Sequence, residues 1–159
     1  MKKYTTVTAD EAVSKIPSHS HIHLSSVAST PQVLIKALCK RADAGDVVDL
    51  HFHHFHTEGE APYSWPKYEG GFFEQGFFIA GNTRLGVNSG YADYTPVHLS
   101  ESPFLYKSGA IELSAALVQI SLPDENGMVS LGTSVDCSPA AIATAKTVIG
   151  VVNSNVPYS

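Results

Sequence analysis

The stretch Ala115–Asp136 reads AALVQISLPDENGMVSLGTSVD, and it decides the fold that we expect. Its opening apolar run, Ala115–Ile120, is typical of a strand that is buried on both faces. Leu122-Pro123 ends this strand, because proline has no amide hydrogen to donate to a neighbouring strand. Asn126-Gly127 suits the positive φ angles of a tight turn, after which Met128–Leu131 is expected to return as a short strand. The pattern predicts a central strand in a sheet that is covered on both sides.

A strand–helix–strand unit is predicted nearer the N-terminus. Residues 20–25 (SHIHLS) and 47–55 (VVDLHFHHF) are expected to be strands. The helix between them should start at Thr30-Pro31, as N-cap and first helical residue, and end near Ala44-Gly45. Such units are right-handed in about 98% of cases, so the two strands should run parallel. The loops that follow them then lie at the same carboxyl edge, where open α/β sheets bind ligands.

The rest of the chain alternates between helix and strand signals. We expect a helix after the Thr8–Glu11 capping box, a helix over 82–89 closed by Gly90, a strand over 95–99, a helix from Ser102-Pro103, and a helix over 140–152. The apolar segment 72–79 is expected only to be buried. This alternation predicts an α/β fold, with a mostly parallel open sheet and helices on both faces.

Composition excludes several classes of protein. The 159 residues are 43% hydrophobic and 16% charged, which is ordinary for a globular domain. The formal charge of −5 argues against a nucleic-acid partner, and no apolar run approaches the roughly 20 residues that span a bilayer. We expect no signal peptide after Met1-Lys2-Lys3 and reduced thiols at Cys39 and Cys137, both consistent with a cytoplasmic location.

Several blocks of the sequence resemble blocks of one protein family, and they occur in the same order along the chain. Residues 118–136 resemble the signature of the acetyl-CoA hydrolase/transferase family, which includes acetate and 4-hydroxybutyrate CoA-transferases. The other family-like blocks are Thr30-Pro31, 56–63 (HTEGEAPY), 81–84 (GNTR), 92–96 (ADYTP) and 99–103 (LSESP). Members of this family are more than twice as long as this chain and are built from two similar α/β halves. The resemblance implies that residues 1–159 form an incomplete N-terminal domain with a truncated CoA-transferase-like sheet, and that the second catalytic half is absent.

The resemblance also implies an activity and its partners. A glutamate would attack an acyl-CoA and form a glutamyl-CoA thioester, from which CoA passes to a small carboxylic acid such as acetate, butyrate or 4-hydroxybutyrate. Coenzyme A is then a substrate and no cofactor is expected; the partners are acyl-CoA and small carboxylates, and the full-length enzyme is expected to be a homodimer. An acyl-CoA hydrolase and a non-catalytic fragment remain alternatives. The 159 residues alone are expected to be inactive.

The nucleophilic glutamate is expected outside this chain, so the catalytic residues within residues 1–159 stay unknown. Glu58 is a weak candidate, because His56-Thr57-Glu58 is similar to the context of the family's nucleophile, although a role in shaping the loop is favoured. The predicted substrate-binding residues lie in the two loops at the carboxyl edge: Ala28, Ser29, Thr30, His56, Thr57 and Gly59. Relatives tend to be richer in glycine before Thr-Pro than Ser26–Ser29, which weakens the expectation of close backbone approach to a ligand.

Other polar residues have competing interpretations. His51, His53, His54 and His56 could suggest a zinc-binding protein, with His19, His21 and His23 as further donors, but we expect no metal site, since imidazoles also serve as hydrogen-bonded sheet residues. Glu125-Asn126-Gly127 is similar to the Glu-Asn-Gly of a different CoA-transferase family, but a turn is favoured. Arg84 could hold an anion or simply be exposed on a helix, and Asp93 is expected to order a turn.

Overall fold

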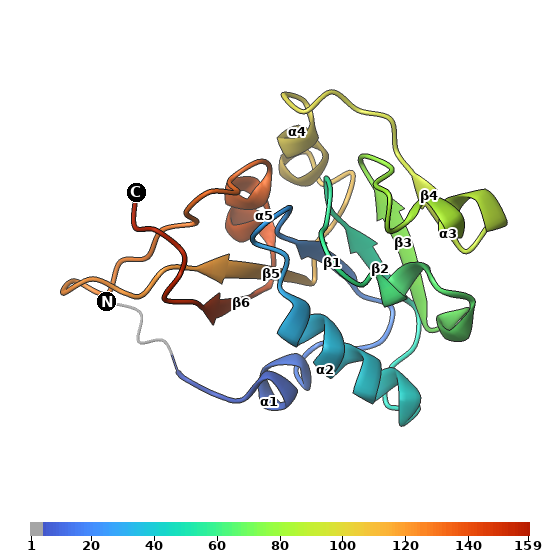
Figure 1. The fold of residues 1–159 in the computed structure, drawn as a ribbon, viewed down its shortest axis with the longest axis horizontal. Coiled ribbons are helices and arrows are strands. Elements are labelled where there is room, and N and C mark those ends of the chain that lie inside the picture. The colour runs from blue at the N-terminus through green and yellow to red at the C-terminus, as the bar shows by residue number, and fades with distance from the viewer. Residues whose placement is uncertain (1–4) are drawn as a thin grey trace.

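The computed structural model describes residues 5–159, and these form a six-stranded sheet in the order β4-β3-β2-β1-β5-β6 (Figure 1). The strands are β1 (His21–Leu24), β2 (Leu50–His53), β3 (Phe72–Gly76), β4 (Ala92–Tyr94), β5 (Ala115–Ile120) and β6 (Thr147–Val152). Every pairing between neighbouring strands is parallel. The predicted α/β sheet is therefore confirmed.

Two helices cover one face of the sheet. Helix α1 (Ala9–Val13) begins with the predicted capping box, in which the Thr8 side chain accepts from the Glu11 amide and the Glu11 carboxylate accepts from the Thr8 amide. Helix α2 (Gln32–Asp43) lies beside it in Figure 1. Both pack on the apolar side chains that β1, β2 and β5 present to this face, and these form the larger core: Ile22, Leu24, Leu50, Phe52, Ala115 and Leu117, with Val13, Leu34, Ile35 and Leu38 from the helices.

Two shorter helices cover the opposite face. Helices α4 (Ser102–Lys107) and α5 (Ser138–Thr144) contribute Tyr106, Ala140 and Ala141 to a second buried cluster with Ala116 of β5. Helix α3 (Arg84–Ser89) lies beside β4 at one end of the sheet and ends at Gly90, as predicted, with φ +82°. Two 3₁₀ turns, Pro62–Ser64 and Pro66–Tyr68, lie between β2 and β3. Among the described residues, no helix has the length and apolarity that a membrane crossing requires.

The predicted strand–helix–strand unit is confirmed. β1 pairs in parallel with β2, with His21 opposite His51 and His23 opposite His53. β5 is the strand next to β1 on the other side, and its first four residues are buried, as the sequence predicted. The sheet is thus built outward from these three central strands, whose carboxyl ends share one edge.

Three predicted elements are wrong. Residues 140–152 do not form one helix, because α5 ends at Thr144 and β6 follows at Thr147; β-branched side chains in this segment favour a strand that pairs with β5 along its whole length. The strand predicted over 95–99 is instead β4, at Ala92–Tyr94, and the segment 95–99 contains Pro96. The turn at Asn126-Gly127 exists, with Gly127 at φ +76°, but Met128–Leu131 is not a strand.

Candidate functional site

The two loops predicted to line a site lie side by side at the carboxyl edge of the sheet. The Val27 amide donates to the His56 carbonyl at 2.7 Å, and Val27 and Thr57 form a parallel β-bridge. Val27 has φ +51°, a left-handed conformation that strains a β-branched residue. The bridge extends the pairing of β1 and β2 into the loops, so the predicted adjacency of Ser26–Ser29 and His56–Gly59 is confirmed.

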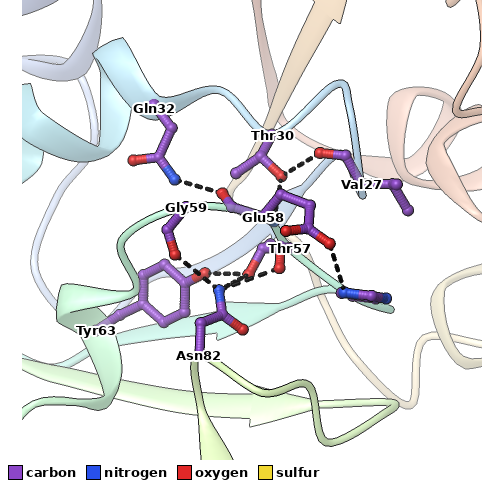
Figure 2. Close-up of polar contacts among 9 residues, drawn as sticks. Val27, Thr30, Gln32, Thr57, Glu58, Gly59, Tyr63 and Asn82 are labelled. Atoms are coloured by element: carbon purple, nitrogen blue, oxygen red, sulfur yellow. Dashed lines mark hydrogen bonds and ion pairs between the residues drawn. The ribbon is translucent and has the colours of Figure 1, made fainter.

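Thr30 joins the two loops instead of capping the helix. Its hydroxyl donates to the Val27 carbonyl at 2.7 Å and accepts from the Glu58 amide at 3.0 Å (Figure 2). The predicted N-cap at Thr30 is wrong, because α2 starts at Gln32 and the capping position is Pro31, which has no side-chain hydrogen bond. The Thr30 hydroxyl instead binds the Glu58 amide of the neighbouring loop, which is distant in sequence.

The amides that lead into α2 are used within their own turn. Ser29 donates to the Ser26 carbonyl at 3.0 Å, Thr30 to the Val27 carbonyl at 3.1 Å, and Gln32 to the Thr30 carbonyl at 2.9 Å. The Ser29 carbonyl accepts from the Ser25 hydroxyl at 2.6 Å. A ligand carboxylate would have to compete with these bonds, so His56 is the more accessible donor of the site.

Gln32 holds the second loop from the start of α2. Its side-chain amide donates to the Glu58 carbonyl at 2.7 Å and the Glu60 carbonyl at 3.0 Å. Gly59 lies between them with φ +86°, and a Cβ there would be only 2.8 Å from Gln32 Nε2. The loop therefore requires glycine for its backbone conformation and for the approach of Gln32.

Thr57 is the buried centre of the site. Its side chain is fully buried, and its hydroxyl lies 2.5 Å from the Tyr63 hydroxyl. Asn82 donates from Nδ2 to the carbonyls of Thr57 and Gly59, at 3.0 and 3.1 Å (Figure 2). Burial raises the pKa of Tyr63, so its hydroxyl stays protonated. Thr57 thus acts mainly on the shape of the loop.

The open side of the site carries His56, Glu58 and Ala28. The His56 Nε2 lies 3.1 Å from the Glu58 carboxylate, and their side chains are 37% and 62% exposed. The His56 ring stacks on Phe78 at 5.9 Å between ring centroids. Ala28 is exposed, and its carbonyl accepts from Gln119 Nε2 of β5 at 3.0 Å. The Glu58 carboxylate thus pairs with its own neighbour, and the favoured loop-shaping role stays a prediction.

A buried polar pair joins the residue after β2 to the middle of β3. His54 Nε2 is 3.2 Å from Glu74 Oε1, and the two side chains are 0% and 1% exposed. Among the described residues, neither nitrogen of His54 nor Oε2 of Glu74 has a hydrogen-bond partner, so the pair is a buried polar contact near the site that is only partly satisfied. Sequence reasoning gave Gln32, Tyr63 and Glu74 no role, since contacts between distant segments create their roles. Tyr63 and Asn82 are the two that a signal could have found, because each belongs to a family-like block.

Four other histidines, His19, His21, His51 and His53, lie close together on β1, β2 and the segments before these strands. The His21 ring stacks on those of His51 and His53, at centroid distances of 4.7 and 5.0 Å, and its Nδ1 is 2.8 Å from His53 Nε2. His19 and His51 both bond the Asp49 carboxylate and hold its pKa below the usual range. These nitrogens have protein partners, whereas the buried Nδ1 of His53 has no hydrogen-bond partner among the described residues. The expected absence of a metal site on these histidines stays a prediction.

Comparisons with known proteins identify relatives of the chain. The chain is 38% identical over 155 residues to the 4-hydroxybutyrate coenzyme A transferase of Clostridium kluyveri, covering 98% of this chain and 36% of that protein. It is 36% identical over 150 residues to the succinyl-CoA:acetate/propanoyl-CoA:succinate CoA transferase of Fasciola hepatica, covering 94% of this chain and 31% of that one. The crystal structure of RipA from Yersinia pestis matches with a TM-score of 0.87 at 28% identity, over 96% of this chain and 37% of that chain.

The chain therefore spans about a third of the length of these relatives. The acetyl-CoA hydrolase/transferase N-terminal domain matches residues 1–159 in full. Together with the all-parallel sheet and the paired loops at its carboxyl edge, this match shows that the chain belongs to the acetyl-CoA hydrolase/transferase family, as its N-terminal domain.

Proposed function

We propose that this chain is the N-terminal part of an enzyme that transfers CoA between an acyl-CoA and a small carboxylic acid. In this proposal the loops 26–30 and 56–59 line the acyl or acceptor side of the pocket. The observation that carries it is the direct bonding of the two loops, through Val27–His56 and Thr30–Glu58, at the edge where α/β sheets bind ligands. The relatives' names support the class of reaction.

The proposed chemistry is double displacement on a glutamate that lies outside this chain. The carboxylate oxygen adds to the acyl carbon, the CoA thiolate leaves, and a mixed anhydride forms. The thiolate then attacks the glutamyl carbonyl, which releases the acyl group as a carboxylate and leaves a glutamyl-CoA thioester. The acceptor carboxylate passes through the same two steps in reverse, so one difficult transfer is divided into easier ones. Coenzyme A is a substrate throughout, and the acceptor class is that of acetate, butyrate and 4-hydroxybutyrate.

His56 is the residue of this chain best placed to meet a carboxylate. Its Nε2 already faces the carboxylate of Glu58 at 3.1 Å, and both side chains reach solvent. An incoming carboxylate of similar geometry can replace Glu58 as the partner of His56, because the two anions use the same donor. Ala28 lies exposed on the adjoining loop, where its small side chain leaves room for an acyl group. If water reached the glutamyl thioester in place of an acceptor, the site would act as a hydrolase.

Binding can be tested directly on the 159-residue chain. Nuclear magnetic resonance titration with acetate, butyrate and 4-hydroxybutyrate is expected to shift the amide signals of residues 26–30 and 56–59. Sodium chloride at matched ionic strength is the control, and His56→Gln should weaken the shifts. Shifts confined to other parts of the chain, or shifts that chloride reproduces, would contradict the proposed pocket.

The transfer reaction can be tested in a chimaera in which this chain replaces the corresponding part of the C. kluyveri enzyme. We expect the KM for the acceptor to rise with Ala28→Leu, while the KM for acyl-CoA stays the same. Ala44→Leu, at an exposed alanine at the C-cap of α2, is the matched control and should change neither. An equal change of both KM values with Ala28→Leu would overturn the assignment of this loop to the acceptor side. The expected homodimer can be measured on the same chimaera by light scattering.

A further inference from the structure

A second group of polar side chains lies between β1 and α5, outside the two loops. His23 belongs to β1 and is completely buried, and Cys137 is the buried residue at the N-cap of α5. Asp136 precedes it and is only half-buried, with φ +30°. One ligand atom from each of the three side chains lies within 4.8 Å of the other two. A nitrogen, an oxygen and a sulfur ligand from distant parts of the sequence thus converge on one point.

Both nitrogens of His23 have polar neighbours. Its Nδ1 lies 3.0 Å from the hydroxyl of Tyr106, a buried residue of α4, and this contact fixes the ring. Its Nε2 lies 3.0 Å from the Ser138 hydroxyl, which in turn lies 3.3 Å from Asp136 Oδ1. The Ser138 oxygen therefore lies between the imidazole and the carboxylate. A metal-binding histidine is characteristically held in this way, with its second nitrogen bonded to a neighbouring oxygen.

We propose that His23, Asp136 and Cys137 bind one zinc ion, with the Ser138 hydroxyl or a water molecule in the fourth position. Imidazole nitrogen, carboxylate oxygen and thiolate sulfur are the ligands that zinc takes in proteins, usually four in a tetrahedron. Binding forms the zinc–sulfur bond and releases the thiol proton to solvent. A divalent cation, a thiolate and a carboxylate sum to zero charge, which suits a site with two buried ligands. The half-buried Asp136 gives the ion a route from solvent.

The competing interpretation is a hydrogen-bonded chain without metal. In that chain the Tyr106 hydroxyl donates to His23 Nδ1, His23 Nε2–H donates to Ser138, and Ser138 donates to Asp136. Every polar group in it is satisfied, so the two interpretations must be separated by experiment. Sequence reasoning named His23 as a further donor but expected no metal, because imidazoles also serve as hydrogen-bonded sheet residues and Cys137 has no metal-like spacing. The trio is recognised only after folding has joined β1 to the segment before α5.

Cobalt is the informative probe, because its spectrum reports the ligands. The chain, purified without an affinity tag, is expected to hold about one zinc by elemental analysis. Replacement by cobalt should give a thiolate-to-metal charge-transfer band and the visible bands of a tetrahedral site. Cys137→Ser should abolish the charge-transfer band, whereas Cys39→Ser, which removes the other cysteine, should leave it unchanged. Tyr106→Phe should weaken zinc binding by about 10- to 100-fold through loss of the bond to Nδ1.

Each outcome decides the proposal. A cobalt spectrum without a thiolate band, or one that survives Cys137→Ser, would show that metal binds elsewhere, for example on the surface histidines, and would overturn it. Thermal unfolding of the unsubstituted chain gives an independent measure that needs no folded variant. Zinc should raise the midpoint and magnesium should not, because zinc favours nitrogen and sulfur ligands. Equal midpoints with zinc, magnesium and chelator would support the hydrogen-bonded chain.

Discussion

The hydrogen bond between Thr57 and Tyr63 is expected to stabilise the candidate site, and a double-mutant cycle can measure it. Thr57→Val removes a hydroxyl but keeps the volume, and it leaves the Tyr63 hydroxyl, 2.5 Å away on a side chain that is 1% exposed, without its partner. An unsatisfied buried hydroxyl costs about 1–3 kcal/mol. Tyr63→Phe should cost less, about 1 kcal/mol, because Asn82 Nδ2 still lies 3.4 Å from the Thr57 hydroxyl.

The double variant is the informative member of the cycle. Removal of both hydroxyls leaves no orphaned group between the two residues, so the combined loss should be smaller than the sum of the single losses. We expect a coupling of about 1–2 kcal/mol. The free energies of unfolding come from urea denaturation followed by circular dichroism, with the slope compared among variants to confirm that the unfolding transition is unchanged.

A matched pair controls for general loosening of the fold. Tyr68→Phe also removes a tyrosine hydroxyl, one that accepts from Lys67 Nζ at 3.2 Å and has no contact with Thr57. Its effect should add to that of Thr57→Val within about 0.5 kcal/mol. Additivity of Thr57→Val with Tyr63→Phe would refute the reasoning, because two groups that share a hydrogen bond cannot be lost independently.

Three further predictions concern pH, backbone conformation and association. Burial lowers the pKa of His53 to about 3, whereas its unfolded value is about 6.5, so between these pH values only the unfolded chain takes up this proton. The free energy of unfolding should therefore fall by about 2 kcal/mol at pH 5. His53→Gln should make the dependence of this free energy on pH less steep in urea titrations, and an unchanged dependence would contradict the prediction. Gly59→Ala should destabilise the chain by about 1–2 kcal/mol more than Gly45→Ala. Both glycines have positive φ, but only a Cβ at Gly59 would meet Gln32 and break its two hydrogen bonds, so equal losses would argue against this contact. Val148, 45% exposed on the edge strand β6, should promote self-association that Val148→Lys reduces, as measured by light scattering; a monomer before and after the change would refute this.

The sequence was sufficient for the central part of the fold. The run Ala115–Ile120 and the strand–helix–strand unit follow from hydrophobic pattern and handedness, which are local or nearly universal rules. These rules also placed the two loops at one edge, before any contact was known. The segment 140–152 was mistaken because its small apolar residues suit a buried helix as well as a strand. Pairing with β5, a contact with another part of the chain, decided the last six residues.

The details of the site depend on contacts that the sequence does not contain. Thr30-Pro31 has the pattern of a helix start, but the Glu58 amide takes the Thr30 hydroxyl. Gln32 and Tyr63 belong to a helix and a 3₁₀ turn by their local signals, and only the folded chain brings them to the loop 57–59. Sequence reasoning could therefore identify which loops matter, but it could not identify which side chains hold them in place.

The β-bridge between Val27 and Thr57 has a consequence for engineering the candidate site. The Val27 amide donates to the His56 carbonyl, and the Thr30 hydroxyl accepts from the Glu58 amide, so replacing one loop with that of a relative would remove hydrogen-bond partners from the other. The two loops should therefore be transplanted as a pair, together with Gln32. The two loops are separated in the sequence but are in direct contact in the fold. Recombination between relatives should therefore succeed when its crossover points lie outside residues 26–60.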